Sequence, residues 1–312
     1  MRILVVGAGA IGGYFGGRLL EAGRDVTFLV RPRRAAELGA TGLVIKSPLG
    51  DFRQARPPLV EAAALREPFD VVLLSCKAYD LEDAIGAFAP AVGPGTVILP
   101  LLNGMRHLEA LDRRFGERAV LGGQCVISAA LGEAGTIHHL NQSHLLSFGE
   151  RDGTRSARVA AVEAACSGAR FDARLSTAIL QEMWNKWVFI ATLAGITCLM
   201  RATVGDIVAA GGADLAASLL DECDAIARAQ GFALGAASRQ RYTAMLTAPG
   251  SGFAASMLRD IERGGMTEGE HVLGDLLRRG SAPAGTASLL RIAYLHVAAY
   301  EARRARTARP AG

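Results

Sequence analysis

Hydrophobic residues form short unbroken runs in the first half of the chain and recur at helical spacing in the second half. The runs RILVV, DVTFL, DVVLL and TVILP each lead into polar or glycine-rich residues, as buried strands do. Because these strands are apolar on both faces, they predict a parallel sheet covered by helices. Their alternation with helical stretches predicts βαβ units.

Two other segments of the first half predict antiparallel pairing. Residues 43–56 (LVIKSPLGDFRQAR) place Pro48 and Gly50 between two apolar stretches, which indicates a hairpin. Residues 136–149 (TIHHLNQSHLLSFG) alternate between polar and apolar positions. They predict a second antiparallel hairpin, which would close the first half.

From about Leu175 the pattern is helical and rich in Ala, Leu and Arg. Gly231 follows an amphipathic stretch and is expected to end that helix. The change of class near residues 170–178 divides the chain into an α/β domain, 1–174, and an all-α domain, 175–312. The helices predicted in the second domain span 178–200, 203–210, 213–230, 235–247, 255–260, 267–279 and 285–305.

The composition agrees with two globular domains and bears on which kinds of binding partner are expected. The chain has 312 residues, of which 50% are hydrophobic and 21% charged, so a sizeable core is expected. The formal charge is only +4, and the basic residues are scattered apart from 31–34 and the tail 301–312. Nucleic-acid binding usually requires a basic face, so no nucleic-acid partner is expected. The tail is expected to be a solvated end.

Five single cysteines lie in apolar surroundings, without C-x-x-C spacing and without a histidine at ligand spacing. They predict buried thiols in a reducing cytosol and no metal site. The chain starts directly with a strand-like run, so no secretory signal is expected. The apolar run from Trp187 to Met200 is shorter than the roughly 20 residues that span a bilayer. It predicts a buried core helix, and the protein is expected to be cytoplasmic with no membrane partner.

A nucleotide-binding motif opens the chain. Residues 7–12 read G-x-G-x-x-G directly after an apolar strand and before a helix. Such glycines let the backbone approach a pyrophosphate, and the helix N-terminus offers N–H groups to it. The alternative is a glycine-rich turn without a ligand. The predicted cofactor-binding residues of this turn are Gly7, Ala8, Gly9, Ala10, Ile11 and Gly12.

The end of the second strand bears on the choice of cofactor. NAD sites usually have Asp or Glu there, whereas this chain reads LVRPRR with no carboxylate before Glu37. An arginine guanidinium pairs well with a 2′-phosphate. Arg31 is therefore expected to select NADP(H). The alternative is a solvated turn, which suits Arg33 and Arg34 better than Arg31.

Lysine is rare in this chain, which makes its positions informative. Among 34 Lys and Arg residues only Lys46, Lys77 and Lys186 are lysines. Lys77 and Asn103 follow apolar strands, at the end where an open α/β sheet binds ligands. Lys186 lies in the most apolar helix. The alternatives are loop hydrogen bonds for Lys77 and Asn103, and a surface ion pair with Glu182 for Lys186.

Residues 256–274 (SMLRDIERGGMTEGEHVLG) predict a short helix, a break at 263–265 and a second helix. This arrangement would bring Ser256 and Glu268 near one another. By pattern alone these residues are weak candidates, because helix caps and solvated carboxylates explain them better.

As an ordered set, GAGAIG, SCKAYD, NGM, the W-x-K helix and SMLRDIERGGMTEGE resemble the ketopantoate reductase (2-dehydropantoate 2-reductase) family over nearly the whole chain. The resemblance implies a Rossmann domain, a helical domain and an active site in the cleft between them. It implies NADPH-dependent reduction of ketopantoate to pantoate in pantothenate biosynthesis. Lys186 would be the proton donor and Glu268 a second catalytic residue that also contacts the cofactor. Lys77 and Asn103 would contact cofactor and substrate, and Ser256 would lie at the active site.

The chain departs from that family where asparagines are expected to bind the substrate. Ile190 and Ala194, four and eight residues after Lys186, occupy two such positions. Val204 and Phe253 occupy two others. A substrate site lined by Asn103, Lys186, Ile190, Ala194 and Ser256 would offer fewer hydrogen bonds than the family's site.

Three questions therefore stay open at the level of sequence. The substrate is ketopantoate or a more apolar 2-oxo acid or ketone. A different class of protein, a non-catalytic NADP(H)-binding sensor, is the other hypothesis, but a sensor would not need Lys186 and Glu268. The apolar helices of the second half suit a homodimer interface and a monomer core equally well.

Overall fold

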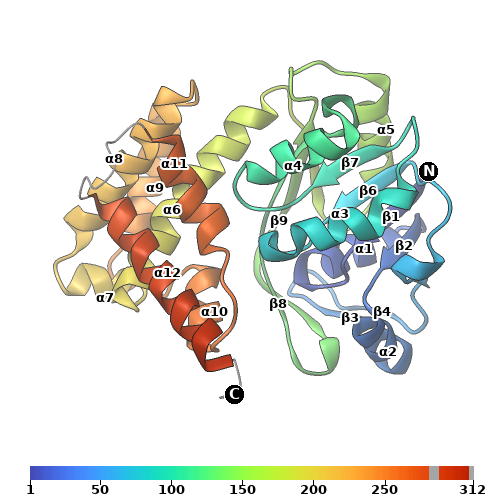
Figure 1. Cartoon of the computed structure of the whole chain (residues 1–312), viewed down its shortest axis with the longest axis horizontal. Coiled ribbons are helices and arrows are strands. Elements are labelled where there is room, and N and C mark those ends of the chain that lie inside the picture. The colour runs from blue at the N-terminus through green and yellow to red at the C-terminus, as the bar shows by residue number, and fades with distance from the viewer. Residues whose placement is uncertain (281–287, 309–312) are drawn as a thin grey trace. The chain divides into compact units, whose positions relative to one another are not determined.

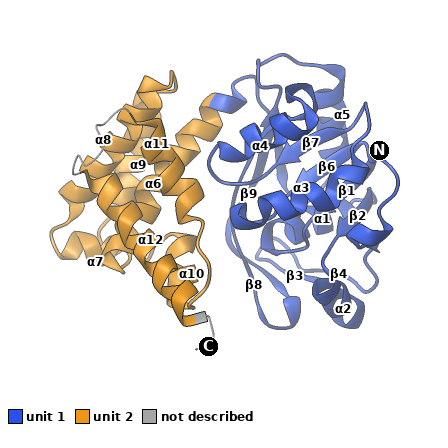
Figure 2. Cartoon of the chain, in the orientation of Figure 1, with its two compact units in different colours: residues 1–180 blue, residues 181–312 orange. Residues whose placement is uncertain are grey.

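The structure is a computed structural model that describes residues 1–280 and 288–308. The chain divides into two compact units, Met1–Leu180 (unit 1) and Gln181–Gly312 (unit 2), shown in separate colours in Figure 2. Unit 1 contains the strands and unit 2 is helical (Figure 1). The predicted fold class, a Rossmann-type region followed by a helical region, is thereby confirmed.

Unit 1 contains a five-stranded parallel sheet with the order β5-β2-β1-β6-β7. The predicted βαβ alternation is confirmed, because each crossover between β1, β2, β6 and β7 contains a helix. The strands are β1 (Arg2–Val6), β2 (Asp25–Leu29), β5 (Leu59–Val60), β6 (Val71–Leu74) and β7 (Val97–Pro100). The main helices are α1 (Ala10–Glu21), α2 (Pro32–Thr41), α3 (Leu81–Phe88) and α4 (Arg106–Phe115).

A second sheet in unit 1 has the order β10-β9-β3-β4, with β8 paired to β9. Its strands are β3 (Leu43–Lys46), β4 (Phe52–Gln54), β8 (Gly122–Leu131), β9 (Ile137–Gly149) and β10 (Asp172–Leu175). The hairpin predicted around Pro48–Gly50 is confirmed, since β3 and β4 pair antiparallel. Helix α5 (Ala157–Cys166) precedes β10.

The hairpin predicted within residues 136–149 is wrong. This segment is one strand, β9, and its antiparallel partner is β8. The connecting turn lies at Glu133–Gly135, where Ala134 and Gly135 have positive φ. Residues 140–143 are exposed and lie at an irregularity of the pairing between Ile127 and Ala129. The alternation within residues 136–149 therefore belongs to one strand, whose antiparallel partner lies earlier in the chain.

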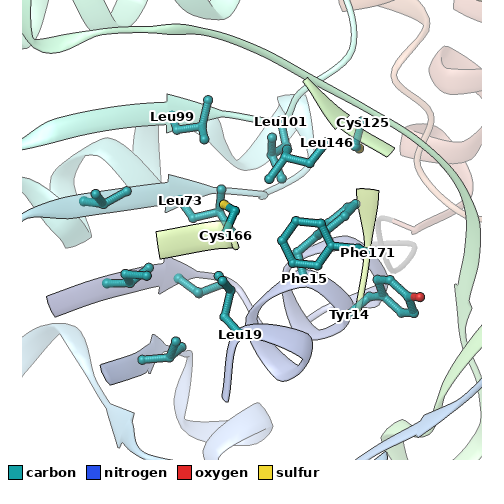
Figure 3. Packing of buried hydrophobic residues seen from close by; sticks show 14 of the residues in the cluster. Tyr14, Phe15, Leu19, Leu73, Leu99, Leu101, Cys125, Leu146, Cys166 and Phe171 are labelled. Atoms are coloured by element: carbon teal, nitrogen blue, oxygen red, sulfur yellow. The ribbon is translucent and has the colours of Figure 1, made fainter. Parts of the chain in front are cut away.

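Helix α1 packs between the two sheets, and its glycines make this possible. A Cβ at Gly16 would lie 2.6 Å from the ring of Phe28 in β2, and a Cβ at Gly17 would lie 2.7 Å from Ile45 in β3. The buried cluster around α1 includes Phe15, whose ring meets that of Phe171 edge-on at 5.0 Å (Figure 3). The helix that carries the glycine motif is thus fixed on both sides.

Unit 2 consists of helices, as predicted. They are α6 (Ile179–Met200, whose first two residues belong to unit 1), α7 (Val204–Ala209), α8 (Ala213–Ala229), α9 (Ala236–Leu246), α10 (Ser256–Glu262), α11 (Asp275–Arg279) and α12 (Leu289–Ala308). Gly231 ends α8 as predicted: at φ +88° it donates to the Arg228 carbonyl, and Phe232 donates to Ala227. The helix predicted over 267–279 is instead a π-helical turn, Glu270–Gly274, followed by α11.

The longest apolar helix, α6, meets the length and composition criteria of a membrane span, but its most apolar window is 67% buried inside the structure. Trp187 and Val188 are fully buried. This is the burial of a core helix, as the sequence predicts.

Residues 285–287 of the last predicted helix, and residues 309–312 of the tail, lie outside the described ranges.

All five cysteines are free thiols. Cys125, Cys166, Cys198 and Cys223 are buried as predicted, whereas Cys76 is half-buried. Burial raises the pKa of Cys166, Cys198 and Cys223 to about 12, which keeps these thiols protonated and unreactive.

We expect iodoacetamide at pH 8 to modify Cys76 first in the folded protein, because thiolates react and only this thiol is partly accessible. Peptide mass spectrometry after a short exposure would locate the label. A denatured sample, in which all five cysteines should react, is the control. Labelling of Cys166 or Cys223 at the rate of Cys76 in folded protein would contradict this burial pattern.

Candidate active site

The glycine-rich turn has the geometry that its sequence predicts. Strand β1 ends at Val6, Gly7 turns the chain at φ +92°, and α1 begins at Ala10. A Cβ at Gly12 would collide with the Gly7 carbonyl oxygen and with Ser75 Oγ. Ser75, at the end of β6, donates a hydrogen bond from its hydroxyl to the Val6 carbonyl at 2.9 Å. Gly7 and Gly12 are therefore required by the protein's own backbone.

Gly9 is different, because the protein itself does not require a glycine there. Its φ of −79° and ψ of −161° suit any residue, and a Cβ would meet no atom of the described chain within 4 Å. No side chain caps α1, and its first turn contains no acidic residue. The site therefore leaves room for another group beside open backbone N–H donors, which is what a pyrophosphate needs.

Four predicted cofactor residues follow neighbouring strands of one parallel sheet. In the order β2-β1-β6-β7, these strands lead into Arg31, Gly7, Lys77 and Asn103, respectively. Since the strands are parallel, all four residues lie at the same edge of the sheet. Lys77 and Asn103 are half-buried. The sheet order, which the sequence could not supply, brings together residues that are up to 96 positions apart.

The three arginines after β2 have three different environments. Arg31 is 65% exposed and forms an ion pair with Asp80 at 2.7 Å, whose hydrogen bond raises the pKa of Arg31. Arg33 is 93% exposed, as expected for a solvated turn. Arg34 is not solvated: its Nε donates to the Ala8 carbonyl and its Nη2 to the Gly135 carbonyl, both at 3.0 Å.

Arg34 is therefore a residue that sequence reasoning misjudged. Its guanidinium ties the glycine-rich turn to the turn between β8 and β9. No local signal could reveal this, because Gly135 lies 101 residues away and β8 was not predicted.

In unit 2, Lys186 lies on α6 and is half-buried. Within the described part of the chain it forms no hydrogen bond or ion pair, so the predicted alternative, a pair with Glu182, does not occur. The neighbouring Trp187 donates from its indole N–H to the Val272 carbonyl at 2.9 Å. This bond ties the helix of Lys186 to the π-helical turn.

Glu268 lies two residues before that turn begins. Its carbonyl accepts hydrogen bonds from the N–H groups of His271 and Val272, and its side chain is half-buried. The adjacent Thr267 N–H donates to Glu301 of α12 at 2.6 Å. π-Helical turns are rare and frequent at functional sites. The tertiary structure thus fixes the backbone around Glu268 and joins its segment to the helix of Lys186.

The other predicted substrate residues differ in exposure. Ser256 is exposed at the start of α10, and Ile190 is half-buried on α6. Ala194 and Val204 are buried, whereas Phe253 is 39% exposed. Of the four positions where the sequence lacks asparagines, Ile190 and Phe253 therefore offer side-chain surface. In the ranges 1–280 and 288–308, no group of three or more His, Cys, Asp or Glu could hold a metal ion.

A Rossmann-type sheet with an open glycine turn, followed by a helical unit, has the architecture of a dinucleotide-binding protein. Models of the two regions "Ketopantoate reductase PanE/ApbA" and "Ketopantoate reductase PanE/ApbA C terminal" match residues 3–153 and 178–301. The chain belongs to the ketopantoate reductase family, whose members bind NAD(P)H and act on small 2-oxo acids.

Three comparisons illustrate the range of similar proteins. The uncharacterized oxidoreductase YkpB of Bacillus subtilis is 41% identical over 97% of this chain and 99% of its own length. The crystal structure of 2-dehydropantoate 2-reductase from Geobacter metallireducens GS-15 superposes with a TM-score of 0.85 at 28% identity, covering 96% of this chain and 99% of that one. A D-mandelate dehydrogenase bound to NADH and anilino(oxo)acetate has the same fold, with a TM-score of 0.85 at 19% identity, covering 98% of this chain and 100% of that one.

Proposed function

We propose that this protein catalyses the NADPH-dependent reduction of a 2-oxo acid to the 2-hydroxy acid. Ketopantoate is the first candidate substrate, which would place the protein in pantothenate biosynthesis in the cytoplasm. The observation that carries the proposal is Lys186, a half-buried lysine without an ion-pair partner among the described residues, on a helix tied to the segment of Glu268. In the division of labour that we propose, residues 1–174 bind the cofactor and residues 175–312 supply the catalytic groups.

The residues of unit 1 fit a dinucleotide. The space beside Gly9 and the uncapped N-terminus of α1 suit the pyrophosphate, with Gly7 to Gly12 as its backbone cradle. The exposed guanidinium of Arg31 suits a 2′-phosphate. Lys77, Asn103 and Glu268 are the further residues that we assign to cofactor contact. When bound, NADPH supplies the hydride.

Lys186 has two tasks in the proposed reaction. As the carbonyl carbon gains a hydride, negative charge grows on the carbonyl oxygen, and the Lys186 ammonium stabilises that charge. The ammonium then donates one proton to this oxygen, which completes the alcohol, and neutral Lys186 regains a proton from solvent. An arginine could perform the first task and hardly the second, because its pKa is too high.

The remaining residues position the substrate. Ser256 and Asn103 are our candidates for binding its carboxylate, and Ile190 for lining its side chain, whereas the predicted Ala194 is buried. Glu268 is the proposed second catalytic group. A panel of 2-oxo acids, with NADPH oxidation followed at 340 nm, tests the proposal directly. A protein that binds NADPH tightly and oxidises it with no member of the panel would instead be the non-catalytic sensor.

A more apolar 2-oxo acid is the second candidate substrate, and the exposures of Ile190 and Phe253 favour it. A hydroxyl left unpaired in an apolar site costs about 1–3 kcal/mol. We therefore expect kcat/KM for ketopantoate to be roughly tenfold below that for 3,3-dimethyl-2-oxobutanoate, which has the same carbon skeleton without the hydroxyl.

Side-by-side kinetics of these two acids decide between the candidates. A clear preference for ketopantoate would show that other groups bind its hydroxyl, and would assign the protein to pantoate formation.

A further inference from the structure

Three aromatic side chains of unit 2 form a row next to the face of α6 that carries Lys186. The ring centroids of Tyr242 and Phe189 are 4.7 Å apart, and those of Phe189 and Phe253 are 6.1 Å apart with an interplanar angle of 20°. Tyr242 is buried, Phe189 is half-buried and Phe253 is 39% exposed. This aromatic row, Tyr242–Phe189–Phe253, therefore runs from the core to the surface of the unit.

The middle member of the aromatic row, Phe189, lies on the same helical face as the proposed proton donor. On α6, Phe189 and Ile190 follow Lys186 by three and four residues, respectively. This spacing places each of them beside Lys186, with Cβ atoms about 5–6 Å apart. A half-buried lysine that shares its helical face with a ring and a branched alkyl group is complementary to a particular kind of molecule. That molecule has an electron-rich oxygen at one end and an apolar group at the other.

The exposed end of the row is held in place by backbone hydrogen bonds. The Phe253 carbonyl accepts a hydrogen bond from the Val204 N–H at 2.9 Å, and the Ser251 carbonyl accepts one from Gly205 at 2.8 Å. This approach requires a glycine, since a Cβ at Gly205 would lie 2.7 Å from the Gly250 carbonyl carbon. The ring is thus presented to solvent by a fixed backbone, which lowers the entropic cost of binding a ligand against it.

We propose that the aromatic row binds an aromatic side chain of the substrate, so that the substrate class is aryl-bearing 2-oxo acids such as phenylpyruvate. This inference rests on the proposed reductase function and names its substrate. Aromatic rings prefer offset-stacked or edge-on pairs at centroid separations of about 4.5–7 Å, the spacing within the row, and a substrate ring extends the row by one member. A saturated ring of the same size lacks this contribution.

The test compares phenylpyruvate with 3-cyclohexylpyruvate, which has a similar size and the same carboxylate and carbonyl. NADPH oxidation gives kcat/KM for both acids. We expect the original protein to prefer the aromatic acid by about tenfold, the factor that one good ring pair contributes. Equal values for the two acids would overturn the inference.

Three variants assign the preference to the aromatic row. Phe253→Leu keeps an apolar side chain but removes the ring, and should bring the ratio of the two kcat/KM values close to one. Phe253→Tyr keeps the ring and should retain the ratio. The matched control is Phe232→Leu, because Phe232 stacks on Trp184, two residues before Lys186 and outside the row, at 5.4 Å. An aromatic preference that persists in Phe253→Leu would overturn the assignment.

Calorimetry can measure how tightly NADP⁺-loaded protein binds the 2-hydroxy acids that correspond to phenylpyruvate and 3-cyclohexylpyruvate. Together with the turnover data, these affinities separate the proposed reductase function from the proposed aromatic substrate class. Turnover of both acids without aromatic preference would leave the reductase standing and remove the aromatic substrate class. Tighter binding of the aromatic hydroxy acid, lost in Phe253→Leu, without turnover of any 2-oxo acid would support the aromatic row and refute the reductase. Absence of both binding and turnover would refute both.

Discussion

Replacing Lys186 with alanine is expected to lower kcat by a factor of about 10³ or more while the dissociation constant of NADPH changes little. Loss of a positioned proton donor typically costs 10²–10⁴ in rate, and loss of stabilisation of the developing oxyanion adds to it. NADPH binding should persist because the residues that fit the dinucleotide phosphates belong to unit 1, whereas Lys186 belongs to unit 2.

Lys186→Arg separates the two tasks of the lysine. It keeps a positive charge on α6 but not a readily transferable proton, so its kcat should stay far below that of the original protein. Lys46→Ala is the matched control, because Lys46 is an exposed lysine paired with Asp51 at 2.6 Å, in unit 1. Steady-state kinetics and fluorescence titration with NADPH provide the measurements. An arginine variant with nearly full activity would show that the group acts by charge alone.

Replacing Arg31 with aspartate is expected to weaken NADPH binding by roughly 100-fold and to leave NADH binding little changed or improved. The original protein should bind NADPH much more tightly than NADH, since a guanidinium pairs strongly with a phosphate and no carboxylate replaces it at this strand end. The variant brings a third carboxylate next to Asp80 and Asp83, which lie 2.7 and 3.9 Å from the Arg31 guanidinium. Repulsion of a 2′-phosphate would therefore add to the lost attraction.

The neighbouring Arg33 offers the control for Arg31. Arg33→Asp makes the same change in charge on the same turn, but its side chain is 93% exposed and pairs with Glu37. It should alter NADPH affinity only slightly, through screened long-range attraction. Loss of the exposed Arg31–Asp80 pair should cost at most about 1 kcal/mol of stability, so both variants should fold. Equal affinity of the original protein for NADH and NADPH would refute this role of Arg31.

The sequence by itself determined the features that depend on neighbouring residues. The glycine turn could be read from residues 7–12, because strand, glycines and helix follow one another without interruption. The short hairpin around Pro48–Gly50 and the stop of α8 at Gly231 are local in the same way. The ordered motifs also sufficed for the family, although the substrate and the roles of the site residues stay predictions.

The tertiary structure decided what depends on distant partners. Arg33 and Arg34 are adjacent and identical in type, yet only Arg34 meets the carbonyls of Ala8 and Gly135, because α2 faces a turn formed about a hundred residues later. The misread strand β9 could not be recognised without its partner β8. Phe253 is aligned with Phe189 only because α7 hydrogen-bonds the segment that carries it. In each case the free energy comes from contacts between segments far apart in the chain, which local patterns cannot encode.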